Sequence, residues 1–120
     1  GPTLYPEAGR WLWRTRMMIG HGLAEASVAP RLQQVLPEAE QSETLKDRYT
    51  GRMARAVAVL ESQADALIPG AMRMDKICAV IGLGHMEFRH GEDWRDDAPN
   101  LAAWYDDAME RPSFAETAMD

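Results

Sequence analysis

Apolar residues recur at helical spacing along most of the chain, and no stretch shows the strict alternation of a half-buried strand. The first predicted helix covers about residues 6–28, the second about 42–66 and the third about 74–88. A fourth begins near Pro99, because helices accept proline in their first turn. The pattern therefore predicts an all-α fold, a bundle of four to five helices.

The first predicted helix is apolar on more than one side. One face carries Leu12, Ile19, Leu23 and Ala26, a second carries Trp13, Met17 and Ala24, and a third carries Trp11 and Met18. A helix with several apolar sides must be covered on several sides, so we expect part of that cover to come from outside this short chain. Pro30 has no amide hydrogen and is expected to kink or end the helix.

The second and third predicted helices differ in their patterns. The second has one apolar stripe and is expected to stop at Ile68-Pro69-Gly70; its solvated surface is predicted to carry Lys46, Asp47, Arg48, Arg52, Arg55 and Glu61. Residues 77–84 are apolar all round and include Gly82 and Gly84. Each glycine costs about 1 kcal/mol in a helix, which is tolerable where another backbone approaches closely. The third helix is therefore predicted to be the buried, central one.

The last thirty residues predict a polar loop followed by short helices. Residues 89–97 form the predicted loop around Trp94, and an amphipathic helix follows, capped by Asp97 or Ala98. Ser113 and Glu116 have the spacing of a capping box, in which each side chain satisfies a backbone amide. One short closing helix is expected there.

Length and charge limit the classes of protein that fit. The 120 residues suit one domain, and the formal charge of −6 argues against a nucleic-acid partner. A single cysteine excludes an internal disulfide and fits a reducing compartment, so we expect a cytoplasmic protein. No apolar run reaches the roughly 20 residues of a membrane span. Residues 1–3 are predicted to be a tag remnant and linker, because Gly1-Pro2 lacks a leading methionine.

The residues that usually carry chemistry are scattered. His21, His85 and His90 lack metal-ligand spacing, and Cys78 sits in an apolar helix, where a packed thiol is expected. Neighbouring acidic residues point to different sides of a helix, and no serine lies in a nucleophile motif. We therefore predict no catalytic residue and no metal site in this chain.

One constellation stands out near the start of the first helix. Arginines alternate there with tryptophans and methionines: Arg10, Trp11, Trp13, Arg14, Arg16, Met17 and Met18. Aromatic, thioether and cationic groups together could line an apolar pocket with an anion-binding group. The same residues could also form a packing face with arginines reaching to solvent. The pattern alone leaves both interpretations open.

The end of the chain resembles a known family. The matching segments are Asp93-Trp94-Arg95, Pro99, Leu101-Ala102-Ala103-Trp104-Tyr105, Arg111-Pro112-Ser113-Phe114 and Thr117, which look like the closing segment of bacterial glutathione S-transferases. Upstream, Gly84-His85-Met86-Glu87-Phe88-Arg89 is similar to the end of that family's central helix. Leu4-Tyr5-Pro6 and Gly22-Leu23-Ala24-Glu25-Ala26 resemble its first C-terminal-domain helix and the segment before it. In place of the family's Ser/Thr-x-x-Asp cap stands Met72-Arg73-Met74-Asp75-Lys76, where Asp75 is expected to serve the helix terminus.

The resemblance implies that residues 4–120 are the helical C-terminal domain of a glutathione transferase whose N-terminal thioredoxin-like domain is absent. In that family the absent half holds most of the glutathione site and the residue that activates the thiol. Glutathione is then a co-substrate of the whole enzyme, and no cofactor is expected in this chain. The enzyme would be a homodimer that conjugates glutathione to hydrophobic electrophiles.

Within this chain, the resemblance makes the start of the first helix the candidate binding site for the hydrophobic small molecule. The candidate residues are Trp11, Trp13, Arg14, Met17 and Met18. We expect the 120-residue chain alone to be inactive. The alternative is a stand-alone, non-catalytic module that has kept this fold for binding or scaffolding.

Overall fold

A computed structural model describes residues 3–67 and 71–117, and all regular elements in these ranges are helical. Four helices are long and the others are short: α1 (Arg10–Gln34), η1 (Glu38–Glu40), α2 (Glu43–Ser62), α3 (Ala64–Leu67), α4 (Met74–His90), α5 (Trp94–Asp97), α6 (Pro99–Met109) and α7 (Pro112–Ala115). No strand occurs in the described ranges. The predicted all-α fold is confirmed.

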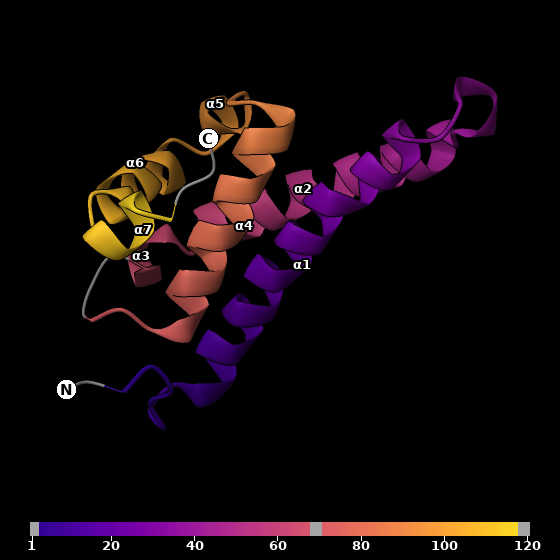
Figure 1. The fold of residues 1–120 in the computed structure, drawn as a ribbon. Helices are drawn as coiled ribbons and strands as arrows, with labels where there is room; N and C mark the ends of the chain where they lie inside the picture. The colour runs from indigo at the N-terminus through magenta and orange to yellow at the C-terminus, as the bar shows by residue number, and fades with distance from the viewer. Residues whose placement is uncertain (1–2, 68–70, 118–120) are drawn as a thin grey trace.

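Two long helices form an arm that extends from the body of the molecule. α1 packs along α4 through its first half and against α2, and Figure 1 shows α1 and α2 running together to a tip at η1. The remaining helices gather beside α4. The molecule is therefore elongated, with extents of 52 × 30 × 25 Å.

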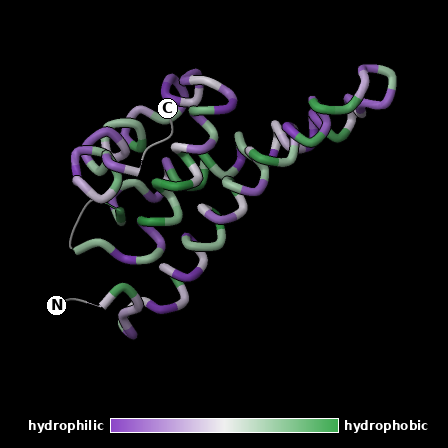
Figure 2. The backbone as a smooth tube through the Cα atoms, in the orientation of Figure 1, coloured by the Kyte–Doolittle hydropathy of each residue, from purple (hydrophilic) through white to green (hydrophobic). Residues whose placement is uncertain are grey.

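The core lies where α1, α2, α3, α4 and α6 meet. Five leucines are fully buried there: Leu23, Leu60, Leu67, Leu83 and Leu101. Along the tube of α1 and α2, hydrophobic and hydrophilic residues alternate in the way an amphipathic helix requires (Figure 2). No helix within residues 3–67 and 71–117 is long and apolar enough to cross a membrane.

Glycines allow α1 and α4 to approach closely. A Cβ atom added to Gly20 of α1 would lie 2.7 Å from the backbone carbon of Cys78, and one added to Gly82 would lie 2.6 Å from the Gly20 carbonyl oxygen. Real Cβ atoms do not approach backbone so closely. The predicted reason for glycine in the third helix, close backbone approach, is thus confirmed at Gly82.

The first two long helices differ from the sequence prediction at their ends. α1 begins at Arg10, after Gly9 with its positive φ of 67°, and continues through the buried Pro30 to Gln34. The expectation that Pro30 ends the helix is wrong. α2 ends at Ser62, and its start is capped by Ser42, whose side chain accepts a hydrogen bond from the Leu45 amide at 3.2 Å.

Two parts of the prediction lie outside the described residues. They are the stop at Ile68-Pro69-Gly70 and the first two residues of the tag remnant.

Glu61 corrects the prediction of a purely solvated surface on α2. Its carboxylate accepts hydrogen bonds from the backbone amides of Asn100 at 3.1 Å and Leu101 at 2.6 Å. These amides lie in the first turn of α6, where the N-cap residue Ala98 offers no side-chain cap. Glu61 therefore caps α6 from a neighbouring helix.

The end of the chain brings two more corrections. Trp94 lies buried in the short helix α5, so the predicted polar loop is partly helical. α7 begins after Arg111 without a side-chain cap, so the predicted capping box of Ser113 and Glu116 is wrong. Arg111, not Ser113, occupies the N-cap position, so the two side chains lie inside and after the helix instead of at its start.

Candidate functional site

The outer face of α1 is formed by Trp11, Arg14 and Met18, which project to solvent. Residues three, four and seven apart lie on one side of a helix, which brings these three together. Trp11 is 71% exposed and Met18 59% exposed. The Arg10 guanidinium carbon lies 5.0 Å from the centre of the Trp11 ring, a cation–π distance. The Arg14 guanidinium carbon lies 5.7 Å from the centre of the Trp13 ring, so the outer face carries an aromatic ring, a thioether and two nearby guanidinium groups.

Trp13 lies on a different side of the helix and is only 3% exposed. Its indole N–H donates a hydrogen bond to the Pro6 carbonyl oxygen at 2.8 Å, and its ring is tilted against that of Tyr5 at 5.9 Å between centres. Trp13 thus holds the segment before α1 against the helix. Of the two tryptophans, only Trp11 is open to a ligand in this structure.

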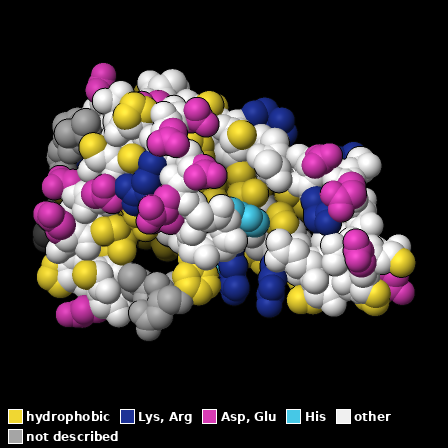
Figure 3. Space-filling model, turned by 90° about the horizontal axis from the view of Figure 1, so that it is seen from above, with side chains coloured by type: hydrophobic (Ala, Val, Ile, Leu, Met, Phe, Trp, Pro, Cys, Tyr) yellow, Lys and Arg dark blue, Asp and Glu magenta, His cyan; other side chains and the backbone are white. Residues whose placement is uncertain are grey.

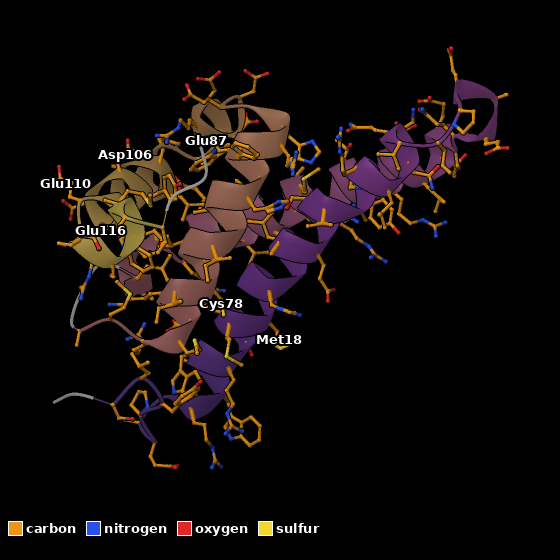
Figure 4. The ribbon with its side chains drawn as sticks, viewed as in Figure 1. Met18, Cys78, Glu87, Asp106, Glu110 and Glu116 are labelled. Atoms are coloured by element: carbon orange, nitrogen blue, oxygen red, sulfur yellow. The ribbon has the colours of Figure 1, made fainter. Side chains whose placement is uncertain are left out.

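Met17 is half-buried, whereas Met18 is 59% exposed. Figure 4 shows Met18 of α1 near Cys78 of α4 on the same side of the molecule. Burial and the nearby Asp75 carboxylate raise the pKa of the Cys78 thiol. A protonated, half-buried thiol is a poor nucleophile, so Cys78 contributes a soft apolar surface here.

A buried ion pair anchors the start of α4 to α1. Arg16 Nε donates to Asp75 Oδ2 at 3.0 Å, and Arg73 donates to both carboxylate oxygens at 2.9 and 3.1 Å. Burial alone would raise the pKa of Asp75, but the hydrogen bonds and charges of the two arginines lower it. Asp75 sits in the first turn of α4, where negative charge is favourable. The sequence placed Asp75 at this terminus but missed Arg16 as its partner.

Two histidines connect the end of α4 to α1 through Ser27. The Ser27 hydroxyl donates to the Ala24 carbonyl oxygen at 2.8 Å, so the contact of 2.7 Å with His85 Nδ1 requires that nitrogen to donate. His90 Nε2 donates to the Ser27 carbonyl oxygen at 2.8 Å. These histidines tie two helices together.

α4 is buried on one side only, which corrects the prediction of a fully buried central helix. Ile81 is 55% exposed and Phe88 43% exposed, seven residues apart on the side away from the core. Figure 3 shows hydrophobic side chains open to solvent around a histidine on the upper face. Like α1, this helix has apolar residues on more sides than this short chain covers.

The described residues are better suited to binding a ligand than to catalysing a reaction. Among residues 3–67 and 71–117, no three His, Cys, Asp or Glu side chains gather as a metal site would require. The outer face of α1 combines apolar contact area with the guanidinium of Arg14, which suits an apolar ligand that carries negative charge or partial negative charge.

Comparison with known proteins adds independent information. Neither protein-family models nor the curated proteins give a match. Among solved structures, a glutathione transferase family member from Pseudomonas fluorescens Pf-5 with bound S-(propanoic acid)-glutathione is 34% identical, with a TM-score of 0.92. The match covers 100% of this chain and 64% of that one. The same protein with bound glutathione gives 33% identity, a TM-score of 0.93 and coverages of 100% and 60%.

A more distant structure has the same fold. The glutathione S-transferase of Methylobacterium radiotolerans JCM 2831, in complex with glutathione sulfonate, is 25% identical with a TM-score of 0.84. The match covers 98% of this chain and 58% of that one. This chain therefore spans about three-fifths of the length of the solved chains that it matches.

Proposed function

Since the chain matches bacterial glutathione transferases over its whole length, we propose that residues 4–120 are the C-terminal helical domain of such an enzyme. The enzyme would conjugate glutathione to hydrophobic electrophiles. This domain would supply the electrophile-binding surface and part of a dimer interface. The glutathione-binding and thiol-activating groups would come from a thioredoxin-like domain that precedes it.

The observation that carries the proposal is the outer face of α1. Trp11 and Met18 present large apolar groups to solvent, and Arg14, on the same side of the helix, holds its guanidinium carbon 5.7 Å from the centre of the Trp13 ring. An electrophile with an aromatic or alkyl body would lie on Trp11 and Met18. Arg14 would bind a polar or anionic substituent, or the developing charge of a leaving group.

Trp13 and Met17 have different proposed roles. Trp13 is buried and its N–H is paired, so it would position the segment before α1 without touching substrate. Met17 is half-buried at the edge of the outer face, where a flexible thioether adapts to differently shaped ligands. In this proposal Trp11, Arg14 and Met18 would contact the electrophile, Met17 would lie at the edge of the outer face, and Trp13 would support it.

The neighbouring domain would act through proximity. A thioredoxin-like domain docked against the first half of α1 would hold a glutathione thiolate beside the electrophile. Orientation of two bound reactants lowers the barrier by several kcal/mol, roughly 7–11 kcal/mol in the best intramolecular cases. The helical domain needs no catalytic side chain of its own for this mechanism.

Steady-state kinetics of the chain joined to its preceding gene segment test this function. The electrophile would be an aryl halide such as 1-chloro-2,4-dinitrobenzene. Trp11→Ala and Met18→Ala should raise the KM for the aryl halide by roughly tenfold and threefold, because each removes apolar contact area. The KM for glutathione should stay unchanged.

Val59→Ala is the matched control. Val59 is an exposed apolar residue on α2, away from the outer face of α1, so its replacement should leave both KM values unchanged. Equal effects of Trp11→Ala on the two KM values, or no effect on either, would refute the outer face of α1 as the electrophile site.

A stand-alone binding or scaffolding module is the other function that this fold could serve. The coding sequence before residue 3 distinguishes the two functions. A thioredoxin-like βαβ pattern in the coding sequence before residue 3 supports the enzyme, whereas a start codon directly before residue 3 supports the module.

A further inference from the structure

A small groove lies between α2, the end of α4 and α5. Its volume is about 220 Å³. Its floor is formed by buried apolar side chains: Met53 and Val57 of α2, Met86 of α4 and Trp94 of α5. An apolar cavity of roughly 150 Å³ can hold benzene, so this groove has room for one ring with a small polar group.

Small residues at the rim create this hollow. Ala54 and Ala58 lie four residues apart on one side of α2, and Gly91 follows the last residue of α4. Ala54 and Ala58 are exposed, so longer side chains at these positions would fill the groove without entering the core. The groove therefore depends on small side chains at its rim.

Two carboxylates give the groove a negative charge. Asp93 and Asp97 lie four residues apart, and both line the groove from exposed positions. Arg95 is close in sequence but does not balance them, because its guanidinium donates hydrogen bonds to Glu87 and Asp106. Of the described residues that line the groove, none is a lysine or an arginine. Such a surface attracts cations and repels anions.

The remaining polar groups of the groove also favour a ligand that donates hydrogen bonds. His90 Nε2 donates to the Ser27 carbonyl oxygen at 2.8 Å, so in the neutral ring Nδ1 is an acceptor. The Thr50 hydroxyl donates to the Lys46 carbonyl oxygen at 3.0 Å, which leaves its lone pairs to accept. The indole N–H of Trp94 is a donor, but it is buried and so is not open to a ligand.

The groove lies far from the start of the chain. The Met74 amide donates to the Leu4 carbonyl oxygen at 3.1 Å, which places residue 4 at the first turn of α4. α4 has 17 residues, a length of about 25 Å, and Figure 1 shows α5 beside its other end. Tyr49 and Arg52 face α1 from the opposite side of α2. A domain that precedes residue 4 would therefore join the molecule away from this groove.

We propose that this groove binds a small organic cation with an apolar body about the size of one aromatic ring. The N–H groups of the cation would donate to Asp93 and Asp97. The ring would lie against Val57 and the flexible thioethers of Met53 and Met86, which adapt to its shape. This site lies apart from the outer face of α1 and does not depend on the proposed glutathione chemistry.

NMR titration of the 120-residue chain with benzamidinium tests the site. This probe joins one aromatic ring to a flat cationic group that carries four N–H bonds, and we expect a Kd on the order of 1 mM. Chemical-shift changes should concentrate at Val57, Met86 and the Trp94 indole, and not at Trp11 and Met18. Benzamide has nearly the same shape without the charge and should bind about fivefold more weakly; benzoate, an anion, should bind at least about tenfold more weakly.

The same titration of the chain joined to its preceding gene segment tests whether the groove stays open in a longer protein. Because residue 4 lies at the other end of α4, the Kd for benzamidinium should change by less than about twofold. Loss of binding in the folded joined protein would overturn the proposal.

Filling the groove tests its shape. Ala58→Leu places a larger side chain at the exposed rim, where leucine suits a helix, and should weaken binding of benzamidinium by at least about tenfold. Ala103→Leu is the matched control: it makes the same change at an exposed position of α6 outside the groove, and should leave binding unchanged.

Neutralising the carboxylates tests the charge. Asp93→Asn and Asp97→Asn should each weaken binding by about threefold, because each removes one exposed negative charge from the wall. Asp96→Asn, on the same short helix but outside the wall, should have a smaller effect than either.

Thermal unfolding of each variant shows whether it still folds. Equal binding of benzamidinium and benzamide would overturn the proposal. So would unchanged binding by a folded Ala58→Leu variant, or chemical-shift changes confined to residues outside the groove.

Discussion

Asp75 is the residue on which the junction of α1 and α4 depends most. It is fully buried, and its carboxylate forms ion pairs with Arg16 and Arg73. Removing one member of a buried ion pair leaves the others uncompensated, at a cost of roughly 3–5 kcal/mol. Asp75→Asn should therefore lower the free energy of unfolding by about 3 kcal/mol, measured by urea denaturation.

The pH dependence of stability provides an independent readout for Asp75. Because its pKa is lowered on folding, its stabilising effect is present above the ordinary value of 3.8 and is lost as the pH falls below it. The wild-type chain should lose stability steeply below that pH, and Asp75→Asn should lose less. Asp65→Asn, at an exposed position on α3, is the control. Parallel pH profiles for wild type and Asp75→Asn would contradict this account.

Glu61 stabilises the start of α6 from outside that helix. Loss of a cap costs about 1–2 kcal/mol, so Glu61→Ala should lower the free energy of unfolding by roughly 2 kcal/mol. Glu61→Gln should restore part of it, since the amide oxygen can still accept one of the two bonds. Glu40→Ala, fully solvated in η1, should have almost no effect. A loss with Glu61→Gln as large as with Glu61→Ala would mean that the negative charge, not the hydrogen bond, matters.

The sequence could not reveal these roles of single residues. Glu61 looks like any charged residue on the polar side of an amphipathic helix, and its partners lie 39 and 40 residues further along the chain. The same holds for Arg16, whose partner is 59 residues away. In contrast, Ser42 caps the helix that follows it directly, and its partner Leu45 is only three residues away, so this role can be seen from local sequence spacing.

At the scale of elements, the crossing of α1 and α4 depends on glycine. Gly20→Ala should destabilise the chain by about 2 kcal/mol, because its methyl group meets backbone atoms that cannot rotate away. Gly22→Ala is the matched control two residues along the same helix, where a Cβ meets nothing within 4 Å. It should stabilise the chain by about 1 kcal/mol through helix propensity. Stabilisation by both substitutions would show that the two helices do not approach as described.

The long helices could be predicted from the spacing of apolar residues along the chain, but the residues at which they begin and end could not. The apolar repeat located α1, α2, α4 and α6, because each buries one continuous stripe. Pro30 misled the prediction, since packing at this buried position outweighs one lost hydrogen bond. At α7 the opposite happened: Ser113 and Glu116 have the spacing of a capping box, but the helix begins after Arg111 and no side chain caps it.

At the scale of the whole molecule, the arm of α1 and α2 explains the elongated shape. The radius of gyration is 15.1 Å, whereas a compact domain of this length would have about 14 Å. The arm exposes a group of apolar residues near its tip: Leu32, Val35 and Leu36. A protruding arm with apolar residues is suited to packing against a second copy of the chain.

Light scattering tests that association. The wild-type chain should show a mass that rises with concentration toward twice 13.4 kDa. Replacing Leu32 and Val35 by serine together should shift the rise to higher concentration by tenfold or more, on the order of 1.4 kcal/mol. Ile81→Ser, equally apolar but away from the arm, should leave the curve unchanged. A wild-type chain that stays monomeric throughout would contradict the dimer proposal.

The candidate site was predictable only in part at this scale. The family resemblance pointed to the start of α1, whereas the apolar pattern alone left a pocket and a packing face both open. The sequence could not tell that Trp13 faces the segment before the helix while Trp11 faces solvent, since that depends on how residues 3–9 fold back.

The central claim is that these helices form one part of a two-part catalyst. Turnover of glutathione with an aryl halide, measured for the 120-residue chain alone and for the chain joined to its preceding gene segment, tests it most directly. We predict no turnover by the chain alone and clear turnover by the joined protein. Turnover by the chain alone, or none by a folded joined protein that includes a thioredoxin-like segment, would contradict the claim.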